Sequence, residues 1–563
     1  MFKNLLFVAA FCVITLGCSK DDPAPQDSTT QQDSTDDDTT NPPDPDDGYT
    51  IADPAFVTGS TARFSMTNIN TSISEIGLVY ATTPNPTTAN ETLVSAETIG
   101  DLHLVISMLE AETTYYVKAY RKTGSEIEYS NEITLETLSA RGTGGTFSGD
   151  IVLLTQSEID AFGRERYINI SGSLTVAHEG ATTDPIVDLS PLNTIESVGT
   201  SLAIHRTTRL TTLLGLENIA SLTQGLTIVE NTKLRDLQYL ENLTSSQIGQ
   251  LYIIENDILE DISALQHVEI VERLLVLGNP LLETIEIPEL RTVNFDVEIR
   301  NNSSITNLNG LENLTTVGRE LTIENNPNLL TLGGLIALQE ADVIHILRND
   351  SLTSLDGLDS LATVSGLVIE YNDSLETLEG LSVSGGSLEV DAITIWENHN
   401  LTSLNGLSSV QGSVDSITIV YNLSIQSING LEGVTQVNYL GIRELPELQN
   451  LDGLEGISNI TEAIILDNLP RLENIDGLNS LTTIDGNNFR IKNLPLITNV
   501  DGLSNLSSAP SSIDLDFEDN IALSDFCGLN NLFIVSGATA RLDVSGCAYN
   551  PDEQDIRDGN CSL

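Results

Sequence analysis

Hydrophobic residues between Leu174 and Leu529 return in a fixed phrase, which is clearest from Leu321 to Leu335. The phrase reads L-x-I-x-x-N-x-x-L-x-x-L-x-G-L, and apolar residues follow it at three-residue steps. Its last Leu recurs every 21–26 residues, about 24 on average, which is the period of a stacked repeat array. The recurring Leu stands at positions 192, 216, 240, 265, 290, 311, 335, 358, 381, 407, 431, 454, 478, 503 and 529.

Within each unit the L-x-I pair alternates in the manner of a β-strand, so its two aliphatic side chains point to one face. Three residues after the second aliphatic residue comes Asn, and an Asn at a strand end can bond backbone groups of its own turn and of its neighbours. We therefore expect a ladder of Asn inside the coil. These Asn are residues 231, 256, 279, 302, 326, 349, 372, 398, 422 and 520, whereas Leu445, Leu469 and Leu494 replace them in three units. The [DN]-G-L turns further along each unit place Gly where we expect a positive φ.

The period and the L-x-I-x-x-N core resemble leucine-rich repeats, and the G-L-x-x-[LV] continuation resembles receptor L-domain-like solenoids. The resemblance implies a mainly β protein in which residues 168–530 form a long right-handed leucine-rich-like β-solenoid of about 15 units of about 24 residues. The N-x-x-L spacing departs from the common leucine-rich N-x-L. A solenoid needs covers at both ends, and we assign these to residues 146–167, with a short helix at Ser157–Phe162 capped by Ser157, and to residues 531–563.

Residues 49–138 alternate apolar and polar positions in short runs separated by turns, which predicts antiparallel strands. The runs at Thr114–Tyr120 and Tyr129–Thr137 resemble strands of a fibronectin type III-like β-sandwich. That resemblance implies a spacer domain. The Gly-rich residues 139–145 are interpreted as a hinge between this domain and the solenoid.

The first 17 residues hold a lone Lys3 and an apolar run that is too short for a comfortable membrane span, and Cys18 follows directly. This arrangement resembles a bacterial lipoprotein signal peptide, and Ser19–Asp22 resembles the surface-export signal of Bacteroidetes-type lipoproteins. The resemblance implies lipidation of Cys18 and a lipid-anchored protein of the outer membrane, exposed on the cell surface. The alternative is an ordinary cleaved secretory signal. After Cys18, residues up to 48 are rich in Asp, Thr and Pro and predict a disordered acidic tether.

Charge and cysteine content narrow the choice of partners. The chain has 24 Lys and Arg against 81 Asp and Glu, a formal charge of −57, which argues against nucleic acid and leaves the attached lipid as the link to a membrane. Such acidity could collect calcium, but no D-x-[DN]-x-[DN]-G loop is present. Three Cys lie near the C-terminus, so a disulfide there leaves one free thiol and the sequence does not choose the pair. We expect a disulfide that involves Cys527, with Cys561 as the candidate partner and Cys547 as the third thiol. A metal site is the rival there, although three Cys without a nearby His make a poor ligand set. We predict no cofactor and no metal.

No catalytic motif occurs among the nucleophile-elbow, phosphate-loop, dinucleotide and zinc-protease patterns. The outward strand positions are more informative, because three adjacent units would bring Tyr371, Trp396 and Tyr421 near one another with Glu370 and Glu397 beside them. We interpret these residues as a platform for a glycan or protein ligand; the alternative is that the rings only pack on neighbouring strands. The predicted function is a non-enzymatic binding or adhesion module. The alternatives are a carbohydrate-active enzyme and a purely structural envelope protein.

Overall fold

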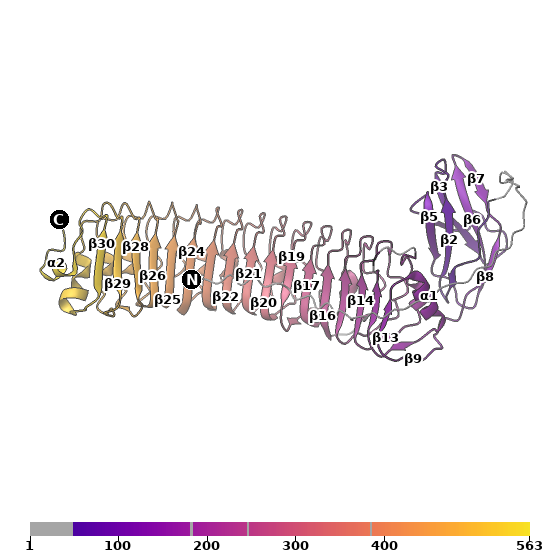
Figure 1. The fold of residues 1–563 in the computed structure, drawn as a ribbon, viewed down its shortest axis with the longest axis horizontal. Coiled ribbons are helices and arrows are strands. Elements are labelled where there is room, and N and C mark those ends of the chain that lie inside the picture. The colour runs from indigo at the N-terminus through magenta and orange to yellow at the C-terminus, as the bar shows by residue number, and fades with distance from the viewer. Residues whose placement is uncertain (1–48, 179, 181–183, 245–246, 383–385) are drawn as a thin grey trace, which may run out of the picture. The chain divides into compact units, whose positions relative to one another are not determined.

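The computed structural model describes residues 49–178, 180, 184–244, 247–382 and 386–563. Residues Thr50–Leu563 form one compact unit. The protein is mainly β, with 35% strand and 9% helix, and from residue 146 onward it is a β-solenoid of about 16 turns, whose strands lie side by side in a row (Figure 1). A repeat solenoid is therefore confirmed, at about one turn more than the sequence predicts.

Residues 50–138 form two antiparallel sheets, which confirms the antiparallel strands predicted there. One sheet has the order β1-β2-β5, and the other has the order β4-β3-β6-β7 with β8 also paired to β6. The strands are β1 (Phe56–Val57), β2 (Ala62–Asn68), β3 (Glu75–Ala81), β4 (Glu91–Val94), β5 (Gly100–Ile106), β6 (Thr114–Thr123), β7 (Glu126–Tyr129) and β8 (Ile133–Glu136).

The solenoid is built on a parallel 19-stranded sheet in which each turn adds one strand, or two short strands, paired with the turn before. Its strands are β10 (Ile151–Leu153), β12 (Leu174–Ala177), β14 (Ser201–His205), β15 (Gly225–Val229), β16 (Gln247–Ile254), β17 (Ile270–Leu277), β18 (Thr292–Val293), β19 (Val297–Arg300), β20 (Thr316–Glu324), β21 (Glu340–Leu347), β22 (Thr363–Glu370), β23 (Glu389–Trp396), β24 (Gly412–Val420), β25 (Val434–Arg443), β26 (Asn459–Asp467), β27 (Thr483–Ile484), β28 (Asn488–Lys492), β29 (Asp514–Glu518) and β30 (Arg541–Ser545). A second parallel sheet joins β9 (Thr146–Phe147), β11 (Asn169–Ile170) and β13 (Ser197–Val198).

Short helices occur on the return path and at the two ends of the solenoid. The α-helices are α1 (Gln156–Arg164) and α2 (Glu553–Arg557), and a π-helix, η9, spans Asn531–Val535. The 3-10 helices are η1 (Ser190–Leu192), η2 (Ser263–Leu265), η3 (Gly333–Leu335), η4 (Glu379–Leu381), η5 (Asn405–Leu407), η6 (Asp476–Leu478), η7 (Asp501–Leu503) and η8 (Cys527–Leu529). Most of them carry the recurring Leu of the repeat.

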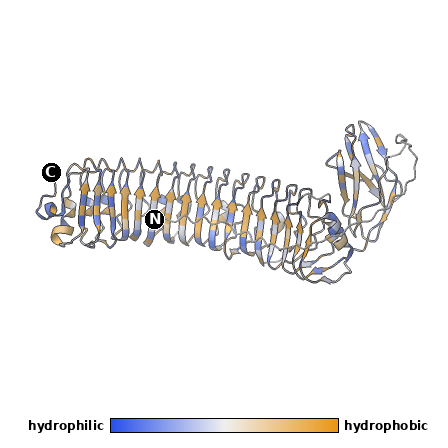
Figure 2. Ribbon diagram, in the orientation of Figure 1, coloured by the Kyte–Doolittle hydropathy of each residue, from blue (hydrophilic) through white to orange (hydrophobic). Residues whose placement is uncertain are grey.

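Both aliphatic residues of each L-x-I pair are buried, as are the Leu residues at the recurring three-residue steps of the return path. In the clearest unit Leu321, Ile323, Leu329, Leu332 and Leu335 all have no exposed surface. Hydrophobic positions consequently recur in strand after strand along the sheet (Figure 2). One continuous core runs from Leu153 to Cys561, because each turn buries its apolar residues against its two neighbours.

The Asn ladder predicted from the sequence is present in the fully buried interior. The backbone N–H of Asn302 donates to Oδ1 of Asn326, 3.1 Å away, and Nδ2 of Asn326 donates to the carbonyl of Ile299 at 2.9 Å. The same pair of bonds repeats from Asn231 to Asn398. Each side chain thereby satisfies a donor of the preceding Asn and a carbonyl at the inward end of the preceding strand, so it is a structural group.

The sequence predicts a positive φ for the glycines of the [DN]-G-L turns, and the structure shows it for some of them but not for others. Gly310 and Gly357 have φ of 97° and 116°, as expected. Gly406 and Gly477 instead lie in 3-10 helices and are not among the positive-φ residues. A Cβ on Gly406 would come within 1.8 Å of the carbonyl oxygen of Leu378 in the preceding turn, so close stacking of the turns excludes a side chain there.

The N-terminal helix starts earlier than predicted, and Ser157 does not cap it. Thr155 is the N-cap: its hydroxyl accepts a hydrogen bond from the backbone N–H of Glu158, whose carboxylate accepts from the backbone N–H of Thr155. The Glu three residues after the cap completes this capping box. Ser157 lies inside the first turn, and its backbone N–H donates to Asp184.

A buried ion cluster joins β2 to the start of the solenoid. The Arg63 guanidinium lies 2.5 Å from a carboxylate oxygen of Asp160 in α1 and 3.1 Å from one of Asp188. Nearby, Arg166 donates to the carbonyls of Ser139 and Arg141 in the Gly-rich segment. The Arg63 ion pairs therefore link residues before the segment 139–145 to residues after it, and the Arg166 hydrogen bonds link the segment itself to the solenoid.

Candidate functional site

Tyr371, Trp396 and Tyr421 lie at the ends of three successive strands, β22, β23 and β24. Trp396 is the last residue of β23, in register with Glu370 and Val420 on the neighbouring strands. Tyr371 and Tyr421 each follow their strand by one residue, with φ of 57° and 56°. In almost every turn the residue before the ladder Asn has this left-handed backbone. The side chain of that residue consequently points away from the solenoid, whereas the side chain of the Asn points into the core.

The structure brings two of the three rings into contact. The ring centroids of Tyr371 and Trp396 are 6.2 Å apart with planes at 30°, a stacked pair. The Arg348 guanidinium lies over the Tyr371 ring at 4.7 Å from its centroid, so Tyr371 is held between the turns before and after its own. Trp396 and Tyr421 remain 36% and 43% exposed, and among the described residues no ring pair joins Tyr421 to the other two.

The two acids predicted at this site differ in position. Glu370 ends β22 beside Trp396 on the outward face, whereas Glu397 occupies the left-handed position between Tyr371 and Tyr421, with φ of 53°. Burial raises the pKa of Glu370 above its usual value, and the nearby Glu397 charge raises it further, while Arg348 acts in the opposite direction.

A polar cavity of about 720 Å³ lies elsewhere, between β2, β5 and the first solenoid turns. Arg63, His103, Asp160 and Arg209 are among its lining residues, and the Ser65 hydroxyl lies 3.1 Å from Nδ1 of His103. Burial and the charges of Arg63 and Arg209 lower the pKa of His103. A hydroxyl–imidazole pair becomes a nucleophile–base pair when a carboxylate orients the imidazole. Within the described part of the chain, no hydrogen bond joins His103 to a carboxylate, so the pair lacks that group.

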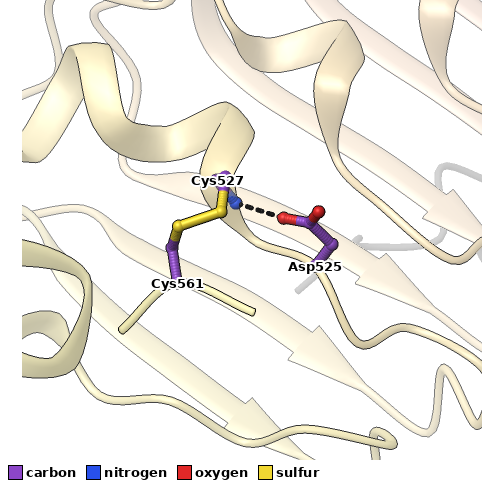
Figure 3. A group of neighbouring side chains, drawn as sticks. All are labelled: Asp525, Cys527 and Cys561. Carbon is purple, nitrogen blue, oxygen red and sulfur yellow. Dashed lines mark hydrogen bonds between the residues drawn. A yellow bond between two sulfur atoms is a disulfide. The ribbon is translucent and has the colours of Figure 1, made fainter. Parts of the chain in front are cut away.

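The C-terminal cysteines form a disulfide between Cys527 and Cys561 (Figure 3). Asp525 lies beside them and accepts a hydrogen bond from the backbone N–H of Cys527 at 2.8 Å. Both sulfurs are used in the disulfide, so they offer no thiolate to a metal ion. Cys547 is a free, half-buried thiol whose pKa is raised by burial. The disulfide ties the last residues of the chain to the end of the repeat core.

Cys18 and the acidic tether lie outside the described residues. Within the part of the chain that is described, no helix has both the length and the apolar character needed to cross a bilayer.

Sequence reasoning missed two features of the aromatic site. One is the support of Tyr371 by Arg348, which comes from the preceding turn at the equivalent left-handed position. The other is the left-handed backbone itself, which Arg, Glu, Asn and Tyr all adopt at this position. The left-handed position can be located in the sequence because it directly precedes the ladder Asn, but no single residue type marks it.

No protein-family model matches the chain, and no curated protein matches its sequence.

Proposed function

We propose that the protein is a lipid-anchored protein of the bacterial cell surface whose solenoid binds an extracellular glycan or protein without catalysing a reaction. The observation that carries this proposal is the aromatic group made of the half-buried Tyr371 and the exposed Trp396 and Tyr421. Large exposed aromatic side chains on an otherwise strongly charged surface are typical of binding sites. The inward Leu, Ile and Asn positions of the repeat have structural roles.

The finer architecture belongs to the same proposal. We assign the two sheets of residues 50–138 to a fibronectin type III-like spacer and the solenoid to the leucine-rich or receptor L-domain-like type. Parallel solenoids present long continuous faces suited to extended partners. The acidic tether would lift these domains from the membrane, since like charges and Pro keep such a segment extended.

Binding is tested with the full chain and two matched variants, Trp396→Ala and Phe295→Ala. Phe295 is also an exposed aromatic residue, at 44%, and Arg273 lies over its ring just as Arg348 lies over Tyr371. Pull-down against cell-surface glycans and proteins should recover a ligand with the unchanged chain and with Phe295→Ala. Recovery should fall at least tenfold with Trp396→Ala. Equal recovery with all three would refute the site.

The cellular address has its own test. Cys18→Ala should move the protein out of the membrane fraction, because a single thiol would carry the lipid. Added proteinase should degrade the unchanged protein on intact cells. Protection from the proteinase until the outer membrane is broken would place the protein inside the envelope.

A carbohydrate-active enzyme is the second candidate, because Glu370 has a raised pKa and Glu397 lies close enough to influence it. A pair of carboxyl groups is the usual machinery for glycoside hydrolysis. Turnover of polysaccharides that is abolished in both Glu370→Gln and Glu397→Gln would establish the enzyme. Binding without turnover would leave the non-enzymatic function.

A further inference from the structure

We infer that the ligand is an uncharged polysaccharide strand that lies along the solenoid axis, across the outward face of β21–β26. This inference rests on the proposed function and names its ligand class. It starts from the two central columns of outward residues on these strands, which alternate with the fully buried aliphatic residues. The first column is Val343, Gly366, Ala392, Ser416, Tyr439 and Ala463. The second is His345, Val368, Thr394, Thr418, Gly441 and Ile465.

Neither column carries a charge at neutral pH, since burial lowers the pKa of His345. The same columns are charged on both sides of this stretch. Before it, Asp296 is paired with Arg273 and Arg319. After it, Arg490 pairs with Asp516, and Arg541 pairs with Asp514. In a chain with a formal charge of −57, two adjacent columns without charge over six strands stand out against their surroundings.

Charge complementarity points to a neutral occupant. Asp342, Asp391 and Asp415 are exposed along one side of the two columns, and the whole molecule repels anions. An acidic polysaccharide or a nucleic acid would therefore meet an unfavourable potential. A cationic partner would be held by these Asp side chains at the edge and would find no counter-charge in the two columns themselves. A neutral sugar chain is the partner that matches the uncharged columns.

The surface chemistry also suits sugars. The hydroxyl groups of Thr394, Ser416 and Thr418 can both donate and accept hydrogen bonds, as sugar hydroxyls do. Trp396 and Tyr421 stand at the other side of the columns with exposed rings, which suit the apolar faces of pyranose rings. An added protein strand is disfavoured, because β22–β25 are each paired on both sides and offer no free backbone edge.

Geometry sets the direction of the strand. Equivalent positions repeat about every 4.8 Å along the axis, so an extended polymer on this axis meets the same groups at each turn. Six strands give a face about 29 Å long at that spacing. Affinity should therefore increase with oligosaccharide length until the face is filled.

Trp396 is the only tryptophan of the chain, so its fluorescence reports this face directly. The full chain is titrated with neutral oligosaccharides of increasing length from β-glucan, xylan and mannan, and with polygalacturonate oligosaccharides as the charged probe. We expect at least one neutral series to shift the emission, with affinity that rises at least tenfold from disaccharide to the longest oligomer and that does not depend on salt. Polygalacturonate should give no shift.

Calorimetry with variants then locates the site. Thr418→Asp, which places a charge in the second column, and Trp396→Ala should each weaken the neutral oligosaccharide at least tenfold, whereas Phe295→Ala should leave the affinity unchanged. Affinity independent of length would overturn the axial placement, and tighter binding of polygalacturonate would overturn the neutral ligand. If no oligosaccharide binds while a captured protein ligand is lost with Trp396→Ala, this inference fails and the proposed function stands. If no ligand of either kind depends on Trp396, both fail.

Discussion

The inside and the outside of the same strands obey opposite rules. Inside, one residue type repeats from Asn231 to Asn422 with no exposed surface, and each side chain bonds to the turn before it. Outside, the residues in register with one another on successive strands include Glu370, Trp396 and Val420. A buried polar group without a partner is costly, so an interior Asn is fixed by its neighbours. An outward residue has no such constraint. An outward residue that is aromatic or uncharged, in a chain that is acidic on average, therefore carries information about function.

The interior also shows where the rule can be relaxed. Leu445, Leu469 and Leu494 replace Asn in three successive turns and are fully buried. The ladder resumes at Asn520, whose Oδ1 accepts the backbone N–H of Leu494 at 2.9 Å and whose Nδ2 donates to Ile491. Leu thus replaces Asn in a block of consecutive turns and not in isolated turns. The free-energy cost of losing Asn–Asn hydrogen bonds therefore falls at the junctions between Asn turns and Leu turns.

Asn326→Leu in the middle of the ladder should have the largest effect of the changes considered. It keeps the branching and the number of side-chain heavy atoms but leaves the Asn302 N–H and the Ile299 carbonyl without partners. At about 1–3 kcal/mol for each such group, we expect a loss of about 2–6 kcal/mol. Urea unfolding combined with hydrogen exchange measures it, because a long array need not unfold in two states. Stability equal to that of the unchanged chain would contradict the account of the ladder.

Arg63→Met tests whether a buried polar cluster that occurs once costs as much stability to disrupt as the repeated Asn ladder does. The change leaves the buried Asp160 and Asp188 without their cation, and breaking such a cluster costs about 3–5 kcal/mol. Burial raises the pKa of Asp188, and Arg63 opposes the rise. In the variant its folded-state pKa therefore stands above the unfolded value, so stability is highest below the unfolded pKa and is lost as pH rises through the folded pKa.

Urea midpoints of both proteins from about pH 4 to about pH 7, a range that begins near the ordinary pKa of Asp, follow this dependence. The deficit of Arg63→Met should be greatest at the upper end. A deficit that is constant across the range would show that the carboxyl group of Asp188 is not the group responsible.

These two regions also show why some features could be predicted and others not. The period, the inward L-x-I residues and the ladder repeat in turn after turn, so a single chain supplies many examples of one local rule. The Arg63 cluster occurs once, between residues 97 and 125 positions apart, and no periodicity points to it. At the aromatic site the residue positions follow from the repeat, but the stacking of Tyr371 on Trp396 and beneath Arg348 depends on side-chain directions set by the left-handed backbone. Ser157 is predicted as the helix cap because Ser is a common capping residue, whereas the Glu158 carboxylate completes a capping box with Thr155.

On the outward side, protonation of Glu370 should have a smaller effect, which is a change in the fluorescence of Trp396. Its pKa is raised above the ordinary 4.5 by burial and by Glu397, and it is the register neighbour of Trp396. The emission of Trp396 should therefore titrate with a midpoint above 4.5, with the protonated form on the acid side. Glu370→Gln should abolish this transition. A transition that persists unchanged in that variant would assign it to another group.

Thr394→Val should have the smallest effect on folding and is the outward counterpart of Asn326→Leu. Both changes remove polar atoms while keeping the number of side-chain heavy atoms. Thr394, however, lies on the outward face beside a natural Val, Val368, in the same column, and Val and Thr both suit strands. Its hydroxyl can reach solvent in the unbound protein, so no buried partner is lost, and we expect a change within about 0.5 kcal/mol by the same urea measurement. If the chain binds a neutral oligosaccharide, the same variant should bind it more weakly. A folding loss as large as that of Asn326→Leu would mean that the outward column is structural, and the contrast between the two faces would not hold.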